Sequence, residues 1–121
     1  MGVARHLRLR RQSDFLKVRS HGQRVHCGPF IFQCLNSPEP VRTEPRMGVI
    51  ASRRVGNAVK RNRGKRLFRE IFRRHRALLP EGSELVIVLR SHFDRHPFED
   101  LENRFVRACG KVRKSEGSDN P

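Results

Sequence analysis

The chain has 121 residues, and its 27 lysines and arginines against 12 acids give a formal net charge of +15. This length is typical of one domain that buries roughly two-thirds of its unfolded surface, so a core can form without metals or disulfides. The charge indicates a polyanionic partner, whereas no apolar run approaches the roughly 20 residues of a membrane span. Three cysteines without CxxC spacing argue against a zinc site or a disulfide framework and favour a reduced, cytoplasmic setting.

The positive charge is concentrated in two segments. Residues 1–24 sum to +6 and residues 53–76 to +10, whereas residues 25–52 sum to zero and residues 77–121 to −1. A charge that served only solubility would be spread more evenly along the chain. The segregation therefore predicts two basic surfaces that meet an anion.

The first half of the chain predicts one helix followed by three strands. Residues 13–22 indicate a short helix, because Phe15 and Val18 fall on one face. Residues 24–35 indicate two strands, or one bent strand, interrupted by a Gly-Pro pair. A turn-rich loop separates them from a third strand over residues 46–53.

The second half predicts a long helix, a buried strand and a final helix, over residues 57–78, 84–90 and 97–110. The order α-β-β-β-α-β-α predicts an α+β fold, a mixed α/β sandwich in which helices pack on one side of a four-stranded sheet. We expect a single domain over residues 1–112. The polar residues 113–121 predict a disordered tail.

The long helix has two chemically different sides. Residues 53–76 contain eleven lysines and arginines and a single acid, Glu70. At about 100° per residue, an apolar arc and a cationic arc lie opposite each other. The apolar arc contains Leu67, Phe68, Ile71 and Phe72, and the cationic arc contains Asn62, Arg63, Arg66, Arg69, Arg73 and Arg74.

A solvated basic face is the usual meaning of such a charge run. Here, however, like charges four residues apart repel, and one acid offsets little of that cost. A partner that supplies the counter-charge is the better explanation. Arginine outnumbers lysine by nine to two in this segment, and the guanidinium group pairs with phosphate through two parallel hydrogen bonds.

The first turn of this helix breaks the pattern, because Lys60 and Arg61 fall on the apolar arc. We therefore expect this end of the helix to extend beyond the core and to be exposed to solvent on nearly all sides. Together with Arg53 and Arg54, about seven cations surround a helix N-terminus, where amide groups and the helix dipole also favour phosphate.

The run ASRRVGNAVKRNRGKRLFRE resembles the signature of the protein component of bacterial ribonuclease P, S-[KR]-[KR]-x-G-x-A-V-x-R-N-R-x-K-R-x-x-R. The pattern is intact from Ser52 to Arg69, and the resemblance extends over about residues 5–110. It implies a four-stranded sheet with a left-handed β-α-β crossover. It also implies a cleft between the first helix and the sheet.

The resemblance further implies a function. The protein would bind the large catalytic RNA of ribonuclease P through the signature helix and the single-stranded 5′ leader of precursor tRNA in the cleft. The RNA, with bound Mg²⁺, would hydrolyse the phosphodiester bond and leave a mature 5′ end. No protein side chain would be catalytic, no metal or cofactor would be held by protein side chains alone, and no obligate protein partner would be needed.

Two sets of site residues follow from the resemblance. The catalytic-RNA surface would comprise Arg53, Lys60, Arg61, Asn62, Arg63, Lys65, Arg66, Arg69 and Arg73. The leader cleft would comprise Phe15, Arg19, Phe30, Ile31, Gln33, Ser52, Arg54 and Arg90. Family members often have aromatic residues at positions 19 and 33, so leader binding here would depend less on stacking and more on charge.

Two rival functions stay open from the residues alone. A basic ribosomal protein or RNA chaperone without a role in tRNA processing is compatible with the composition. A protein nuclease would need a magnesium site and a base, for which the candidates are Asp94, Glu99, Asp100, Glu102, His92 and His96. These acids, however, precede or begin a helix, where negative charge is favourable in its own right.

Overall fold

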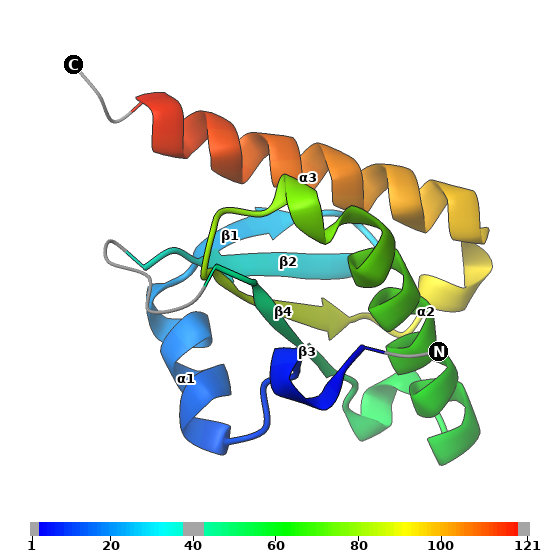
Figure 1. Ribbon diagram of the computed structural model, residues 1–121. Coiled ribbons are helices and arrows are strands. Elements are labelled where there is room, and N and C mark those ends of the chain that lie inside the picture. The colour runs from blue at the N-terminus through cyan, green and yellow to red at the C-terminus, as the bar shows by residue number, and fades with distance from the viewer. Residues whose placement is uncertain (1–2, 38–42, 119–121) are drawn as a thin grey trace.

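The computed structural model describes residues 3–37 and 43–118, and their side chains up to residue 113. Its helices and strands follow the predicted order α-β-β-β-α-β-α (Figure 1). The helices are α1 (Gln12–His21), α2 (Ala58–His75) and α3 (Phe98–Ser118). The strands are β1 (Gln23–His26), β2 (Phe30–Leu35), β3 (Arg46–Ile50) and β4 (Glu84–Leu89).

The four strands form one mixed sheet in the order β1-β2-β4-β3. The pairs β1–β2 and β2–β4 are antiparallel, and β3 and β4 are parallel neighbours connected through α2. Gly28 lies between β1 and β2 with a φ of 84°, a left-handed conformation that glycine adopts without the penalty of a Cβ atom. The α+β class, the four-stranded sheet and the β-α-β crossover are confirmed.

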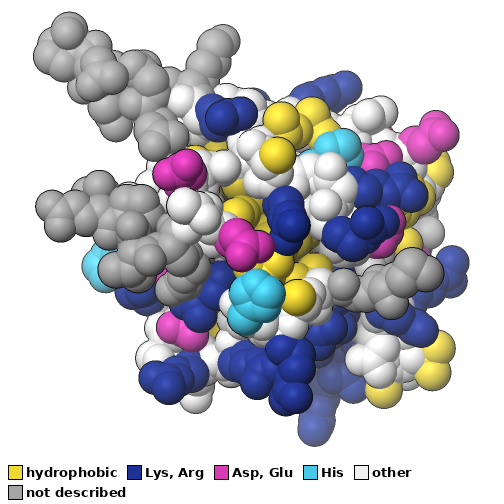
Figure 2. Space-filling view, in the orientation of Figure 1, with side chains coloured by type: hydrophobic (Ala, Val, Ile, Leu, Met, Phe, Trp, Pro, Cys, Tyr) yellow, Lys and Arg dark blue, Asp and Glu magenta, His cyan; other side chains and the backbone are white. Residues whose placement is uncertain are grey.

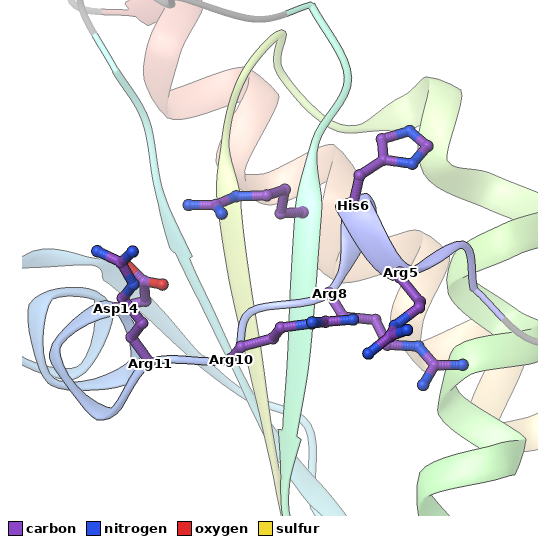
Figure 3. A pocket seen from close by; sticks show the side chains of 7 residues that line it. Arg5, His6, Arg8, Arg10, Arg11 and Asp14 are labelled. Carbon is purple, nitrogen blue, oxygen red and sulfur yellow. The ribbon is translucent and has the colours of Figure 1, made fainter.

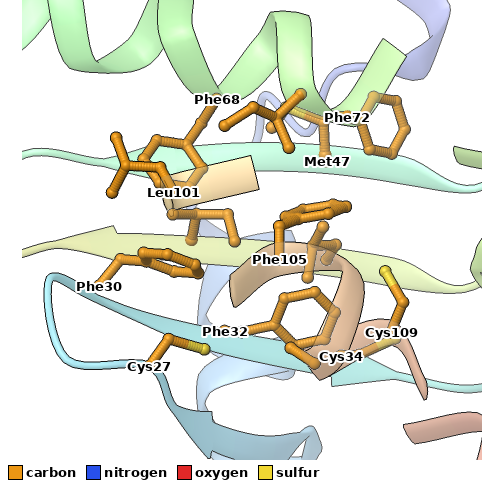
Figure 4. Close-up of a cluster of buried hydrophobic side chains, with 14 of the residues drawn as sticks. Cys27, Phe30, Phe32, Cys34, Met47, Phe68, Phe72, Leu101, Phe105 and Cys109 are labelled. Atoms are coloured by element: carbon orange, nitrogen blue, oxygen red, sulfur yellow. The ribbon is translucent and has the colours of Figure 1, made fainter. Parts of the chain in front are cut away.

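The larger core lies between one face of the sheet and the pair α2 and α3. Alternate residues of β2 point into it, because successive side chains of a strand lie on opposite faces. Phe30 packs edge-on against Phe68 of α2 with ring centroids 4.7 Å apart, and Phe32 packs against Phe105 of α3 at 5.4 Å (Figure 4). All four rings are fully buried, so they attach both helices to this face.

The opposite face of the sheet carries a smaller core, in which Val18 of α1, Val86 of β4 and Leu9 are buried together. The prediction that the helices pack on one side is therefore right for α2 and α3 and wrong for α1. The physical reason lies in β4, whose nearly continuous apolar run presents hydrophobic side chains to both faces. Each face consequently needs its own cover.

The last helix is longer than predicted. We expected it to end near residue 110 and the chain to be disordered from residue 113, but α3 continues to Ser118. Val112 is fully buried and extends the apolar stripe of Phe105 and Cys109 by about one turn. Residues 119–121 of the predicted tail lie outside the described residues.

The three cysteines behave as small apolar residues, as predicted. Cys27, Cys34 and Cys109 are all buried in the larger core. Burial raises the pKa of the Cys27 thiol to about 11 and that of Cys109 to about 12. These two thiols are therefore protonated at neutral pH and poorly nucleophilic.

Glu84 connects α1, β3 and β4. Its buried carboxylate lies 3.1 Å from Lys17 Nζ of α1 and forms an ion pair with Arg46 of β3. Burial alone would raise the pKa of this carboxyl, but the hydrogen bonds from Arg46 and Lys17 and the positive charges of both side chains together outweigh burial and hold the pKa below its usual value of 4.5. The ionised form is thus the one that the fold stabilises.

A pH-dependent stability follows from Glu84. Because the pKa is lower in the folded state, the charged pair stabilises the fold above about pH 4.5 and loses this effect as the pH falls through the folded value. Replacing Glu84 with glutamine should lower the free energy of unfolding by about 1–3 kcal/mol at pH 7, since Arg46 loses its carboxylate. Urea unfolding followed by circular dichroism should show this difference shrink as the pH falls towards about 3. A difference that stays constant with pH would contradict the assignment.

Gly64 allows α2 to approach β4 closely. A Cβ atom at this position would overlap Leu89 Cδ1 and the ring of Phe93. Gly110 on α3 has the opposite environment, because an added Cβ would meet nothing within 4 Å. The two glycines therefore separate the effect of packing from that of helix propensity.

We expect Gly64→Ala to destabilise the protein by about 1–3 kcal/mol through overpacking, although alanine favours a helix. Gly110→Ala should instead stabilise it by up to about 1 kcal/mol, the difference in helix propensity between the two residues. Thermal unfolding of both variants by circular dichroism tests the pair. Equal stabilisation by both would show that α2 does not pack against β4 at Gly64.

Candidate nucleic-acid interface

Helix α2 has the two sides that its sequence predicts. Phe68, Ile71 and Phe72 are fully buried and Leu67 is half-buried, so the apolar arc faces the sheet. At the start of the helix, the side-chain oxygen of Asn57 accepts a hydrogen bond of 2.9 Å from the backbone N–H of Lys60. This cap satisfies one of the four free amides at the helix N-terminus.

The cationic arc faces outward along the middle of the helix. Asn62, Arg63 and Arg66 are exposed, whereas Lys65 and Arg69 are half-buried. Within the described part of the chain, none of these four basic side chains has an ion pair with a carboxylate. We call these five residues the basic face of α2. Its positive charges are not neutralised by the acids of the described chain.

Arg69 lies where the basic face of α2 meets the N-terminal segment. Burial lowers the pKa of Arg69 from its ordinary value, and the nearby charge of Arg8 lowers it further. A guanidinium group nevertheless stays charged near neutral pH. The basic face of α2 therefore continues onto residues that precede α1.

The C-terminal end of the cationic arc is different, because Glu70 neutralises part of it. Its carboxylate accepts two hydrogen bonds from Arg73, at 3.0 and 2.6 Å, and one of 3.0 Å from Arg74. Hydrogen bonds from Arg73 and then from Arg74 lower the pKa of Glu70 to about 2. Arg73 was predicted to contact the catalytic RNA, but here it is paired with the carboxylate of Glu70. Within the described structure, the other predicted catalytic-RNA residues of the cationic arc form no such ion pair.

The expectation that Lys60 and Arg61 are exposed to solvent on nearly all sides is wrong. Both are half-buried, and Lys60 Nζ donates a 2.8 Å hydrogen bond to the carbonyl of Ser91 and lies 3.3 Å from Asp94. The segment that follows β4 folds back against the first turn of α2 and supplies these partners. Its position could not be predicted from the helix alone.

A groove of about 580 Å³ lies between α1 and the end of β3. Phe15 forms part of its wall and packs over β3, since a Cβ atom on Gly48 would overlap the Phe15 ring. Leu16 lies beside it with 56% of its surface exposed. The groove is lined by Arg10, Gln12, Phe15, Leu16, Arg19, Val49, Ile50, Ala51 and Lys65.

Gln33 holds Arg19 in place at the groove. The buried Gln33 amide donates to the carbonyls of Arg19 and Gly22 at 3.0 and 3.1 Å, and its oxygen accepts a 3.2 Å hydrogen bond from Arg19 Nη1. Gln33 therefore acts on the groove through Arg19, whose guanidinium is oriented by this contact. Positions 19 and 33, where the resemblance noted in the sequence would favour aromatic residues, thus form one polar unit.

The other predicted cleft residues are distributed over several places. Phe30 does not line the groove, because it is fully buried against α2 on the other face of the sheet. Ile31 is half-buried and lies on the α1 side of the sheet, opposite Val88 in the register. Ser52, Arg54 and Arg90 are exposed and lie outside the groove lining.

Sequence reasoning missed several residues of the groove lining: Arg10, Gln12, Leu16, Val49, Ile50 and Ala51. Lys65 was assigned only to the catalytic-RNA surface, although it lines this groove as well. The signal for Leu16 was available, because it falls away from the Phe15 and Val18 face of α1. The contribution of β3 depended on knowing that α1 lies across it.

The acids considered for a protein nuclease are largely occupied by bases. His96 Nδ1 lies 2.7 Å from Asp100, His75 Nε2 lies 2.8 Å from Glu102, and Lys60 pairs with Asp94. The hydrogen bond from His96 is the main cause that lowers the pKa of Asp100, and that from His75 is the main cause for Glu102. These carboxylates therefore form contacts within the folded chain and connect α2, α3 and the segment between β4 and α3.

Helices long and apolar enough to cross a membrane are not found in the described part of the chain.

Comparisons with known proteins point to one family. The family model for ribonuclease P matches residues 3–113. The chain is 41% identical to a ribonuclease P protein component of Desulfovibrio desulfuricans over 74% of this chain and 68% of that one. It is 33% identical to the ribonuclease P protein component of Acidothermus cellulolyticus over 92% of both. The structure is similar to the RNase P protein from Thermotoga maritima, with a TM-score of 0.73, 28% identity, and coverage of 86% of this chain and 96% of that one.

Proposed function

Because this chain belongs to the ribonuclease P protein family, we propose that it binds the catalytic RNA of ribonuclease P and the 5′ leader of precursor tRNA. In this role it assists the endonucleolytic cut that produces the mature tRNA 5′ end, and it acts in the cytoplasm. The observation that carries the proposal is the basic face of α2, whose basic side chains form no ion pair with any carboxylate among the residues that the structure describes.

The basic face of α2 suits a folded RNA. Arg63 and Arg66 can each pair with a phosphate through a bidentate guanidinium contact. Asn62 lies beside Arg63 in sequence, and its amide can donate to or accept from a ribose hydroxyl or a base edge. Neutralised phosphates release counterions, so this surface would supply salt-dependent affinity without reading sequence.

The groove suits a single strand. Phe15 and Leu16 offer an apolar surface to unstacked bases, while Arg10, Arg19 and Lys65 offer charge to the phosphates. Gln33 holds the Arg19 guanidinium by the groove, so less of its freedom is lost on binding. Leader binding here would accordingly depend more on electrostatics than on stacking.

Hydrolysis itself is assigned to the RNA. When bound to that RNA, Mg²⁺ would supply an activated water and stabilise the leaving oxygen. Asp94, Asp100 and Glu102 are paired with Lys60, Arg104 and Arg74 respectively, which supports a protein that positions substrate over one that holds a catalytic metal. The residues of this chain bind and orient the two RNAs.

Reconstitution tests this proposal directly. Precursor tRNA is incubated with the protein alone, with a transcribed ribonuclease P RNA alone, and with both, at low magnesium. We expect cleavage only with both components. Cleavage by the protein alone would restore the nuclease alternative, and failure to activate the RNA would favour a ribosomal or chaperone role.

Two arginines on α2 provide a matched test of the interface. Arg66 is exposed on the basic face of α2, whereas Arg73 is paired with Glu70. Arg66→Ala should weaken binding of the catalytic RNA and reduce the slope of log affinity against log salt by about one unit. Arg73→Ala should change both quantities less, although it removes the same side chain. Filter binding over a salt series measures the slopes of both variants and of the wild type, and an unchanged, wild-type slope for Arg66→Ala would remove Arg66 from the interface.

A further inference from the structure

A second concave surface lies beside the groove, between the N-terminal segment, α1 and β3. It has a volume of about 500 Å³ and is lined by Arg5, His6, Arg8, Arg10, Arg11, Asp14 and Arg46. Figure 3 shows Arg5, Arg8 and Arg10 close together on one side and Arg11 beside Asp14 on the other. We call it the arginine pocket. Its lining contains five guanidinium groups and one carboxylate.

The segment that supplies these arginines is held firmly against the sheet. Leu9 donates a backbone hydrogen bond of 2.8 Å to Met47 of β3, and Arg8 Nε donates one of 2.9 Å to the carbonyl of Val3. Leu7 is buried in the larger core and Leu9 in the smaller one, so the chain crosses the edge of β3 between the two cores. The arginines therefore converge before a ligand arrives.

Little of the charge in the arginine pocket is neutralised by residues that the structure describes. Arg5, Arg10 and Arg11 are exposed and form no ion pair with any residue that the structure describes. Arg46 pairs with Glu84 through Nη2, but its buried Nε has no hydrogen-bond partner among the described residues. In Figure 2, Lys and Arg side chains gather in the lower part of the view, where Figure 1 draws the segment before α1.

Such a cluster has the chemistry of a phosphate site. Like charges this close repel one another, and a concave surface concentrates their field on whatever enters it. The planar fork of arginine matches phosphate oxygens, and several forks around one cavity can hold a single phosphodiester group. An anion in the pocket would relieve the repulsion that the protein leaves in place.

The groove and the arginine pocket share one side chain, because Arg10 lines both. A single strand that leaves the groove at Arg10 would enter the pocket without crossing uncharged surface. We propose that the arginine pocket binds a backbone phosphate of the precursor leader, upstream of the nucleotides that occupy the groove. This inference rests on the proposed function and extends its leader site across the edge of β3.

The test uses the reconstituted holoenzyme and precursor tRNAs whose leaders are lengthened one nucleotide at a time. The variant replaces Arg5 and Arg11 with alanine, because both are exposed and neither lines the groove. For the wild-type protein, affinity should rise at the length where the leader first reaches the pocket. The double variant should lose that rise several-fold while binding short leaders as the wild type does. Its salt slope for long leaders should fall by about 0.7 for each phosphate that the variant no longer neutralises.

A matched control removes two exposed arginines of α3, Arg107 and Arg113, and should keep the rise. The charge-preserving variant with lysine at positions 5 and 11 should recover part of it, which separates charge from folding. The inference is overturned if the alanine variant binds short and long leaders equally weakly, or if it is weakened only in its affinity for the catalytic RNA. In both outcomes the wild-type holoenzyme still cleaves precursor tRNA, so the proposed function stands although the inference fails. Failure of the proposed function would instead appear as no cleavage at any leader length.

Discussion

The packing of α2 against the sheet is the contact on which the arrangement of charge depends. Phe68 packs against Phe30, and Gly64 brings the helix axis close to Leu89 and Phe93. Because the apolar side of this 18-residue helix is buried, Arg63 and Arg66 lie on the side that faces solvent. Burial of apolar surface thus offsets the self-repulsion of the arginines, and the repulsion in turn favours a bound polyanion.

The proposal gives different tasks to two surfaces, one on α2 and one on the opposite face of the sheet. Its outer face is covered only by α1 and the N-terminal segment among the described residues, which leaves a groove with apolar walls and a cationic rim. The N-terminal segment crosses the edge of β3 and joins the groove to the basic face of α2, where Arg8 lies near Arg69. The two RNA surfaces of the proposal are consequently one continuous basic band, and not two isolated patches. Such continuity allows a folded RNA and a single strand to be held together.

Much of the fold and of α2 could be predicted because the signals are local. The spacing of Leu67, Phe68, Ile71 and Phe72 determines which side of the helix is buried, and the helix starts after Asn57, a residue type that caps helices well. The errors arise from partners that are distant in the chain. Lys60 is engaged by Ser91 and Asp94, 31 residues or more away. Phe30 was assigned to the cleft, although its alternation with Ile31 admits either face until α1 and α2 are placed.

The most direct measurement is the reactivity of individual arginines towards phenylglyoxal, read by mass spectrometry with and without the catalytic RNA. If the basic face of α2 is the RNA interface, Arg63 and Arg66 should be protected in the complex, while Arg107 and Arg113 on α3 stay reactive. Protection of the α3 arginines, with Arg63 and Arg66 still modified, would contradict the account.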